Sequence, residues 1–166
     1  KNIKIITGGK NRSDSSSKAL KCIKNYNISK VFIHDAARPN FSMNLLSNLF
    51  KGLKKFKCAV PAIKTDNSVK LKKNNKLINI DRDKIYLTQT PQAFDYKTLL
   101  KLQKKTSSKI TDDANLFIES NKRIKLINGE TNNYKITLKK DIVDKKILRY
   151  GIGFDIHKLI LNRKLY

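Results

Sequence analysis

Tryptophan is absent from this 166-residue sequence, and methionine, proline and cysteine are scarce, with one, three and two residues respectively. Two cysteines are too few for a disulfide-stabilised secreted domain, and Cys22 and Cys58 lack the close spacing of metal ligands. Both cysteines lie in apolar stretches. We therefore expect buried, reduced thiols in a cytoplasmic protein.

Long hydrophobic runs are also missing from the sequence. No apolar stretch approaches roughly 20 residues, the length that spans a bilayer, and no signal-peptide pattern opens the chain. We therefore expect no membrane partner. The sequence begins with Lys rather than Met and enters a strand-like run at once, which we interpret as a fragment of a longer protein. With 39% hydrophobic residues it can still bury a core the size of one domain.

Acidic residues are few, 13 against 37 Lys and Arg, which gives a formal net charge of +24. Such a charge is one feature of basic nucleic-acid-binding proteins, which bind DNA with a steep salt dependence. The lysines, however, are spread along the whole chain, with few arginines and no aromatic stripe among them. We favour a compositional origin over this alternative and expect no nucleic-acid partner. The charge would still attract anionic phosphate substrates.

Strand-like runs and amphipathic helices alternate along the chain, which predicts an α/β fold with an open, parallel sheet. Residues 68–82 interrupt the alternation with two β-prone runs around Asn74-Asn75, so we expect a hairpin arm that projects from the body. The predicted strands cover residues 2–7, 30–34, 57–63, 85–90, 123–129 and 133–137. The predicted helices cover residues 15–26, 43–56, 95–106, a segment capped by Thr111 that ends near residue 120, and 138–148.

The stretch VFIHDAARPN, residues 31–40, places polar side chains directly after an apolar run. In open α/β sheets, ligands bind beyond the carboxyl ends of the strands. Asp35 could hold a divalent metal ion there, and Arg38 offers a planar fork of donors suited to phosphate. A surface ion pair between Asp35 and Arg38 explains the same residues equally well. His34 is, at such a place, more often a hydrogen-bonded structural residue than a catalyst.

Weaker motifs accompany this stretch. Gly8 and Gly9 follow a predicted strand and would allow close approach of a ligand, while Ser15 could hydrogen-bond a base or a sugar. Thr90 precedes Pro91, which would hold Thr90 extended with its hydroxyl free to bind. Ordinary turns explain these motifs when each is taken alone.

Lys135 and Thr137 are two positions apart in a predicted strand, so they would point to the same face. A lysine on that face could bind phosphate. Because lysine is plentiful in this sequence, a solvated side chain is the competing interpretation.

The order of the motifs, however, resembles one family. GGKNRSDS, VFIHDAARP, an arm ending in DR, TPQAF, ITDDA and NYKIT follow one another as in 2-C-methyl-D-erythritol 4-phosphate cytidylyltransferases of the non-mevalonate isoprenoid pathway, over residues 1–147. The resemblance implies a Rossmann-like nucleotidyltransferase fold and a homo-oligomer formed through the arm. It also implies CTP and 2-C-methyl-D-erythritol 4-phosphate as substrates and Mg²⁺ as cofactor.

The resemblance implies roles for the first two motifs. Ser15, in the turn opened by Gly8 and Gly9, matches the serine that contacts the cytidine part of the substrate. Asp35 matches the carboxylate near the divalent metal ion and the methylerythritol hydroxyls. Arg38 belongs to the same motif and would support the phosphate region.

The remaining matches concern the substrate phosphate. Arg82 matches the arm arginine that reaches the substrate phosphate in the partner subunit, and Ser68 stands where the family usually has a threonine. The other matched substrate residues are Thr90, Thr111, Lys135 and Thr137.

The implied reaction needs no side-chain nucleophile. A substrate phosphate oxygen attacks the α-phosphate of CTP and displaces pyrophosphate, so Asp35, Arg38 and Lys135 would act by positioning and electrostatics. The Gly-rich loop with Arg and Lys that cradles the triphosphate in this family does not occur in the sequence, which we interpret as an N-terminal truncation. We therefore expect this chain alone to bind CTP poorly and to be inactive.

The tail RYGIGFDIHKL, residues 149–159, resembles instead the N-terminal strand of 2-C-methyl-D-erythritol 2,4-cyclodiphosphate synthase, a lyase of the same pathway. In that family a D-x-H pair supplies two zinc ligands, so the resemblance implies that Asp155 and His157 share one Zn²⁺. Residues on alternate positions of a strand face the same side, which suits this pair. We expect residues 148–166 to begin a truncated α+β cyclase domain of a bifunctional parent, and to bind zinc poorly alone.

A cytidylyltransferase for another polyol phosphate, such as ribitol phosphate, is the nearest alternative. Such relatives share the fold and a similar Asp-x-x-Arg-Pro segment. HDAARP with TPQAF, and above all the cyclase-like tail, favour the methylerythritol enzyme.

Overall fold

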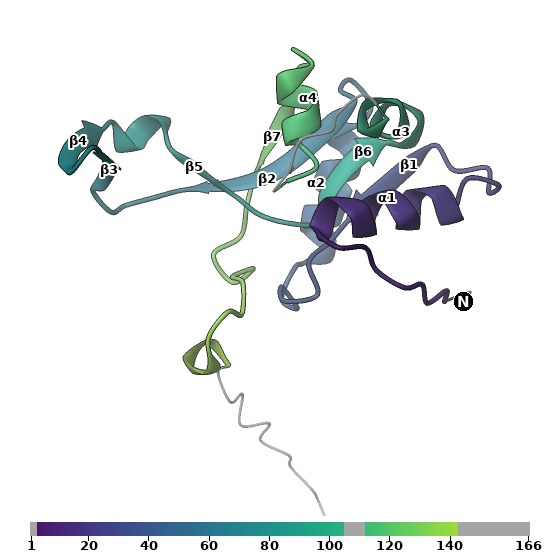
Figure 1. Cartoon of the computed structure of the whole chain (residues 1–166), viewed down its shortest axis with the longest axis horizontal. Helices are drawn as coiled ribbons and strands as arrows, with labels where there is room; N and C mark the ends of the chain where they lie inside the picture. The colour runs from purple at the N-terminus through teal and green to yellow at the C-terminus, as the bar shows by residue number, and fades with distance from the viewer. Residues whose placement is uncertain (1–2, 105–111, 143–166) are drawn as a thin grey trace, which may run out of the picture.

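The structure is a computed structural model that describes residues 3–104 and 112–142. It contains one mixed sheet with helices packed on it and a separate two-stranded hairpin that projects from the body (Figure 1). The helices are α1 (Arg12–Cys22), α2 (Met43–Gly52), α3 (Tyr96–Gln103), α4 (Asn115–Glu119) and the short 3₁₀ helices η1 (Arg82–Lys84) and η2 (Lys139–Asp141). The strands are β1 (Lys30–Ile33), β2 (Cys58–Lys64), β3 (Val69–Lys73), β4 (Lys76–Ile80), β5 (Tyr86–Thr88), β6 (Gln92–Asp95) and β7 (Lys125–Asn128).

The main sheet has the order β1-β6-β2-β5, and β7 pairs with the other edge of β2. The prediction of parallel neighbours is wrong for three of its four pairings: β6 lies between β1 and β2 and is antiparallel to both, and β5 is antiparallel to β2. Two strands that are each antiparallel to β6 must run in the same direction. β1, β2 and β7 are therefore mutually parallel, as their alternation with helices predicted, and β6 is inserted against them.

Side chains of the central strands alternate between two faces of the sheet, and each face carries its own core. Cys58, Val60 and Phe94 belong to one buried cluster, which α1, α3 and α4 cover with Leu20, Leu99 and Phe117 among others. The rings of Phe94 and Phe117 stack there with centroids 5.6 Å apart. Ala59 and Ala93 point to the opposite face, where α2 buries Leu45, Leu49 and Leu53 against them. The alternation of large and small residues thus fits helices on both sides.

The predicted hairpin arm is confirmed. β3 and β4 pair antiparallel from Val69↔Ile80 to Lys73↔Lys76, and the chain reverses at Asn74 and Asn75. Both asparagines have positive φ, 47° and 61°, as a tight hairpin turn requires. The arm exposes a set of large apolar side chains, namely Leu71, Leu77 and Ile78.

Three other predicted elements differ from the structure. The predicted first strand is irregular over residues 3–7, where no described strand pairs with it and Ile3 and Ile5 are 88% and 92% exposed. Residues 133–137 form no strand, and the predicted last helix is only the short η2 within its described part. α4 begins after Ala114, which provides no side-chain cap, while the predicted cap Thr111 lies outside the described residues.

The two thiols are free, as predicted, although only Cys58 is fully buried. Burial, with a smaller contribution from the charge of Asp112, raises the pKa of the Cys58 thiol far above its ordinary value. Cys22 is half-buried at the end of α1. Within the described part of the chain, no helix combines the length and apolarity that crossing a membrane would need.

Candidate functional site

A polar cavity of about 380 Å³ opens beside the carboxyl end of β1 and the connection between β5 and β6. Ligands of open α/β sheets bind at such strand ends. The residues that line it are Arg12, Asp35, Arg38, Thr88, Gln89, Thr90, Gln92, Asp112, Asn115 and Lys135. The structure therefore brings together four residues that the sequence predicted as site residues, Asp35, Arg38, Thr90 and Lys135.

Asp35 lies between two cations in this cavity. Its Oδ2 is 3.4 Å from Lys135 Nζ and its Oδ1 is 3.6 Å from Arg12 Nε. The carboxylate is 21% exposed, so it is accessible from the cavity. The described residues hold no ion pair between Asp35 and Arg38, which argues against the simple surface pair that the sequence left open.

Arg12 is a residue of this site that the sequence analysis did not assign. Its Nη1 donates to Asp113 Oδ2 at 2.6 Å, and Asp113 is almost completely buried. Burial opposes the charge of Arg12, but attraction to Asp113, its hydrogen bond and the nearby Asp35 outweigh burial and raise the pKa of the guanidinium. Arg12 lies inside the predicted motif GGKNRSDS, three positions before Ser15, and that position was the available signal.

Arg38 is fixed by backbone bonds from a distant segment. Its Nη1 donates to the carbonyl of Asn133 at 2.8 Å, and its backbone N–H donates to the carbonyl of Asp35 at 3.0 Å. Asn133 is itself fully buried, and its Nδ2 donates to the carbonyl of Thr90 at 2.9 Å. Gln89 adds donations to the carbonyls of Glu130 and Asn133. The loop around Asn133 therefore closes one wall of the cavity.

Thr90 is buried, and its hydroxyl is not free as the sequence suggested. Thr90 Oγ1 accepts from the backbone N–H of Asp35 at 3.0 Å and lies 3.0 Å from His34 Nδ1. The other ring nitrogen of His34 lies 2.8 Å from the carbonyl oxygen of Arg38. The hydroxyl is thus engaged within the protein, because its position next to the end of β1 offers it two partners.

Lys135 and Thr137 do not share a strand face, contrary to the prediction. The backbone N–H of the intervening Ile136 donates to the carbonyl of Ala37, which brings Lys135 to the cavity beside Asp35. Thr137 instead donates its hydroxyl and its backbone N–H to Asp141, away from the cavity lining. The backbone bonds from Thr137 and Leu138 come first in effect, and together with the Thr137 hydroxyl they lower the pKa of the Asp141 carboxyl.

Gly8, Gly9 and Ser15 form a separate turn at the start of α1 and do not line the cavity. Ser15 Oγ accepts from Gly9 N at 2.9 Å and donates to the carbonyl of Asn11 at 3.0 Å. A Cβ on Gly9 would lie 2.1 Å from the Cβ of Asp14, so only glycine allows this close approach to the helix. Ser15 thus holds this turn from within α1, and the strand predicted before Gly8 is absent from the described residues 3–7.

Ser68 directly precedes β3 and Arg82 begins η1 just after β4, so both lie at the base of the arm, and neither lines the cavity. Arg82 Nη1 donates to the carbonyl of Asp66 at 2.8 Å, and both Ser68 and Arg82 are exposed. Within one chain, the structure therefore does not bring these two residues to Asp35. The remaining predicted residues, Thr111, Asp155 and His157, lie outside the described residues.

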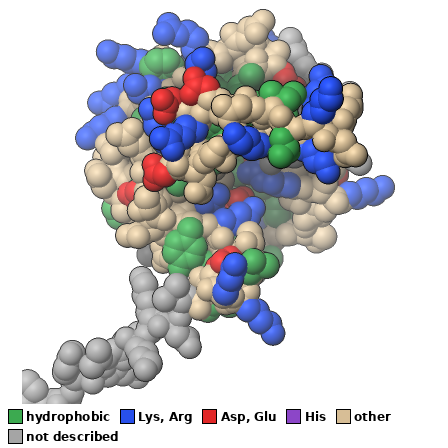
Figure 2. All heavy atoms as spheres, turned by 90° about the vertical axis from the view of Figure 1, so that its left-hand side faces the viewer, with side chains coloured by type: hydrophobic (Ala, Val, Ile, Leu, Met, Phe, Trp, Pro, Cys, Tyr) green, Lys and Arg blue, Asp and Glu red, His purple; other side chains and the backbone are tan. Residues whose placement is uncertain are grey.

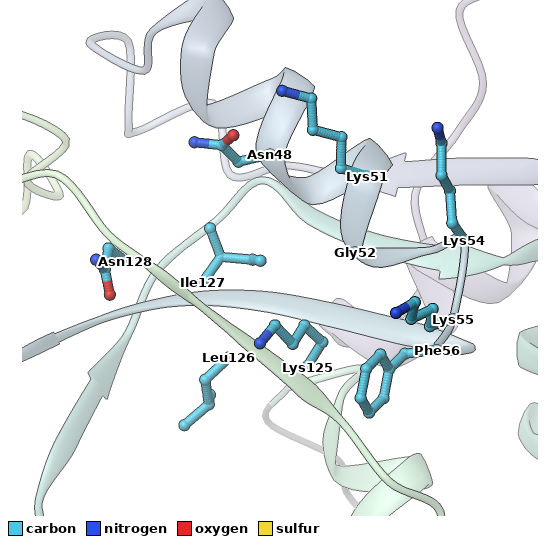
Figure 3. Close-up of a pocket in the computed structure, with 10 residues that line it drawn as sticks. All are labelled: Asn48, Lys51, Gly52, Lys54, Lys55, Phe56, Lys125, Leu126, Ile127 and Asn128. Atoms are coloured by element: carbon cyan, nitrogen blue, oxygen red, sulfur yellow. The ribbon is translucent and has the colours of Figure 1, made fainter.

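A second, larger cavity of about 690 Å³ lies between the end of α2 and β7 (Figure 3). It is lined by lysines and apolar groups, including Lys51, Lys54, Lys125 and Phe56, and by none of the predicted site residues. Three of its lysines, Lys51, Lys54 and Lys55, lie at or just beyond the carboxyl end of α2, where the helix dipole favours cations. We therefore place the candidate site in the smaller cavity, where ionic groups converge.

The charge of the molecule is not concentrated at one place on the face seen in Figure 2, where Lys and Arg side chains are scattered among neutral ones. In the described residues, no group of three or more His, Cys, Asp and Glu side chains is placed to hold a metal ion. Asp35 and Asp112, which both line the cavity, are the carboxylates of this site that could contact a cation.

Comparison with known proteins gives a consistent result. Residues 1–149 match the family of 2-C-methyl-D-erythritol 4-phosphate cytidylyltransferase (IspD). The "Bifunctional enzyme IspD/IspF" of Pelagibacter ubique is 54% identical over 166 residues, all of this chain and 45% of that protein. The protein of the same name from Wolbachia pipientis wMel is 37% identical over 93% of this chain and 41% of its own length. The chain thus spans less than half the length of these relatives.

Solved structures agree with the sequence match. A 4-diphosphocytidyl-2C-methyl-D-erythritol synthase from Anaerococcus prevotii is 32% identical and has a TM-score of 0.78, over 84% of this chain and 67% of that one. The bifunctional IspDF from Campylobacter jejuni is 34% identical and has a TM-score of 0.72, over 82% of this chain and 35% of that one. The mixed α/β sheet with its parallel strands is thus a Rossmann-like nucleotidyltransferase fold.

Proposed function

Because the chain belongs to the 2-C-methyl-D-erythritol 4-phosphate cytidylyltransferase family, we propose that its protein transfers a cytidylyl group from CTP to 2-C-methyl-D-erythritol 4-phosphate. The reaction releases pyrophosphate and belongs to isoprenoid precursor biosynthesis. The observation that carries the proposal is the convergence of Asp35, Arg38 and Lys135 on one polar cavity at the strand ends. The cytoplasm, where reduced thiols such as Cys58 persist, is the proposed location.

In the proposed step, a phosphate oxygen of the polyol phosphate forms a bond to the α-phosphorus of CTP. The bond from that phosphorus to the bridging oxygen breaks, and pyrophosphate leaves with the electron pair. Negative charge spreads over the phosphate oxygens in the transition state, so fixed cations lower the barrier. Lys135 lies beside the cavity with its side chain 48% exposed, and Arg38 is held rigidly by Asn133. Both suit this electrostatic role.

Asp35 is proposed as a ligand of Mg²⁺. Mg²⁺ is commonly held by one or two carboxylates, with substrate phosphates and water completing its shell, so a single accessible carboxylate fits. When bound, the ion would neutralise charge on the phosphates. Lys135 and Arg12 already hold the Asp35 carboxylate at the cavity wall, which keeps it oriented toward the substrate. Ser15, Gly8 and Gly9 are proposed for the cytidine part, and Ser68, Arg82 and Thr111 for the polyol phosphate. The hydroxyls of Thr90 and Thr137 already bind groups of the protein, so we propose no direct phosphate contact for them.

The experiment uses the longer protein that contains this chain and measures pyrophosphate release from CTP with 2-C-methyl-D-erythritol 4-phosphate and, separately, with ribitol 5-phosphate. We expect release with the first acceptor only. Asp35→Asn and Lys135→Met should each lower kcat by about 10²-fold or more, the usual effect of losing a group that stabilises the transition state. Lys54→Met, in the larger cavity, is the matched control and should retain activity. Preference for ribitol 5-phosphate, or full activity in both site variants, would contradict the proposal.

The lengths of the relatives also bear on the domain organisation. We propose residues 1–147 as the cytidylyltransferase domain and residues 148–166 as the start of a cyclodiphosphate synthase domain, as in the proteins named IspD/IspF. Asp155 and His157 would then be zinc ligands. Metal analysis of the longer protein should give one Zn²⁺ per cyclase domain, lost in His157→Ala. Unchanged zinc in that variant would exclude the assignment.

We also propose that two copies associate through the arm, so that Arg82 of one copy reaches the site of the other. The support is that the arm exposes Leu71, Leu77 and Ile78, which are 50%, 70% and 44% accessible. Apolar side chains this exposed are typical of an interaction surface. Leu77→Asp should shift the mass measured by light scattering from dimer to monomer, whereas Lys73→Asp, at the turn, should not. A wild-type monomer at micromolar concentration would contradict the proposal.

A further inference from the structure

His34 directly precedes Asp35 and lies four positions before Arg38, the two residues on which the proposed site depends most. Its Nε2 lies 2.8 Å from the carbonyl oxygen of Arg38, and its Nδ1 lies 3.0 Å from Thr90 Oγ1. A carbonyl oxygen only accepts hydrogen bonds, so Nε2 must carry the proton. In the neutral ring Nδ1 is then an acceptor, and the Thr90 hydroxyl donates to it.

With this assignment, each donor in the chain of bonds has one acceptor. The Asp35 N–H donates to Thr90 Oγ1, the Thr90 O–H donates to His34 Nδ1, and the His34 Nε2–H donates to the Arg38 carbonyl. The Arg38 N–H closes the same turn by donating to the Asp35 carbonyl at 3.0 Å. The imidazole ring therefore couples the backbone of Asp35, through Thr90, to the backbone of Arg38.

The surroundings of the ring favour one orientation. His34 is half-buried and packs edge-on against Phe41, with ring centroids 4.6 Å apart and an interplanar angle of 73°. A ring held by an aromatic face and by a bond at each nitrogen has little rotational freedom. A structural histidine of the core would need these contacts too, but it need not connect two site residues to a threonine that lies 56 positions away in the chain.

We propose that His34 is a positioning residue of the cytidylyl-transfer site. As the neutral Nε2–H tautomer, it directs the Thr90 hydroxyl onto the backbone of Asp35 and holds the Arg38 backbone in the same turn. The inference rests on the proposed function for its kinetic part, and on the hydrogen-bond chain for its structural part. It assigns Thr90 an internal role, since its hydroxyl proton is used within the protein.

The structural part is tested by NMR. The sequence has two histidines, His34 and His157, so His34→Asn identifies the ring signals of His34 by their loss. Long-range ¹H–¹⁵N spectra at pH 8 should give a single Nε2–H tautomer for His34, with Nδ1 as acceptor. Averaging between both tautomers, or an Nδ1–H ring, would overturn the inference. In His34→Ala, the amide signals of Asp35 and Arg38 should shift more than in the surface variant Lys54→Met; equal shifts would also overturn it.

The kinetic part uses substitutions that each keep one bond. An Asn side chain places its amide where Nδ1 lies and can still accept from Thr90, whereas Gln reaches the position of Nε2 and can still donate to Arg38. His34→Ala loses both. We expect the KM for the polyol phosphate to rise by about fivefold for each bond lost, the equilibrium equivalent of one net hydrogen bond. The KM for CTP should change less than twofold.

Thr90 provides the second half of the test. Thr90→Ser keeps the hydroxyl and should remain near wild type, while Thr90→Val loses it. His34→Ala and Thr90→Val both remove the bond between Thr90 and His34. If the two residues act through one chain, the double variant should therefore raise the KM by less than the product of the two single effects, and a fully multiplicative effect would contradict the coupling. Lower thermal midpoints with unchanged KM values at a temperature where all variants are folded would reduce His34 to a stabilising residue. Absence of transfer in the wild type would contradict the proposed function alone, and the NMR outcomes would still decide on His34.

Discussion

The ion pair between Arg12 and Asp113 allows a sharp stability prediction. Asp113 is 1% exposed, and its Oδ2 accepts from Arg12 Nη1 at 2.6 Å. Among the described residues, this oxygen also accepts from the Ser16 hydroxyl, at 3.4 Å, which is long for an O–H···O bond. Arg12→Ala therefore removes the short ionic bond of a carboxylate that lies in the protein interior.

The magnitude follows from burial. Removing one partner of a fully buried ion pair typically costs about 3–5 kcal/mol, because the remaining charge is left uncompensated. The side chain of Arg12 is 33% exposed, so water screens part of this interaction. We therefore expect Arg12→Ala to lower the free energy of unfolding by about 2 kcal/mol. With a typical urea dependence for a domain of this size, the unfolding midpoint should fall by about 1 M.

The assay is urea unfolding followed by circular dichroism at pH 7, with Lys84→Ala as the matched control. Lys84 pairs with Asp81 at 3.4 Å, but the two side chains are 81% and 54% exposed. Such a surface pair is worth about 0–1 kcal/mol, so the control should change little. Asp113→Asn in the Arg12→Ala background removes the unpaired charge and should recover part of the loss. If Arg12→Ala and Lys84→Ala cost the same, the argument from burial is refuted.

Three further predictions concern single positions. The Asp95 carboxylate caps α3 by accepting a hydrogen bond from Thr98. Burial opposes the charge of this carboxylate, but the bonds from Thr98 and from Lys57 outweigh burial and lower the pKa of Asp95. The stability that this carboxylate contributes is therefore present above about pH 4 and is lost as the pH falls through the lowered pKa. Asp95→Asn keeps the cap but removes the titrating group, so the thermal midpoint of this variant should depend less steeply on pH on the acid side. An unchanged acid slope would contradict this prediction. Gly9→Ala would bring a Cβ to 2.1 Å from that of Asp14. In the longer protein we therefore expect this variant to bind cytidine nucleotides more weakly by calorimetry with an unchanged far-UV spectrum, and equal binding would exclude the turn from the site. Asn133→Ala removes the Nδ2 group that donates to the buried carbonyl of Thr90. It should therefore lower the free energy of unfolding, measured in urea, by about 1–3 kcal/mol. A loss below about 0.5 kcal/mol, the smallest net value of one hydrogen bond, would contradict the assigned bond.

The sequence was sufficient to find the cavity but not all of its walls. Asp35 was found by the rule that ligands bind at strand ends, and Thr90 by its place before Pro91 and by the family resemblance; both line the cavity. Arg12 was missed because its meaning depends on Asp113, which lies 101 positions away in the chain. Lys135 was found, but through a wrong strand; its position is set by the bond from Ile136 to Ala37, which no local pattern announces.

The sheet shows the same limit. Alternation of strands and helices predicted the common direction of β1, β2 and β7. β6 was not predicted, because it has only four residues beside Pro91, between the predicted strand 85–90 and the predicted helix 95–106. Short buried strands lack the length that makes periodicity visible. Conversely, residues 2–7 have a strand-like composition, yet the described part of this segment forms no strand. A strand depends on a neighbour for its hydrogen bonds, which composition alone does not provide.

The bonds that build the cavity have a consequence for the order of folding. Several of them join residues 41 to 101 positions apart, such as Gln89 to Glu130, Asp35 to Thr90 and Arg12 to Asp113. Each such bond requires closure of a long loop, whose entropy is lost before the bond forms. Helices and the β3–β4 hairpin can form from local contacts, but the cavity can exist only when the whole sheet has assembled. The cavity should therefore be among the last parts to gain protection from hydrogen exchange during refolding.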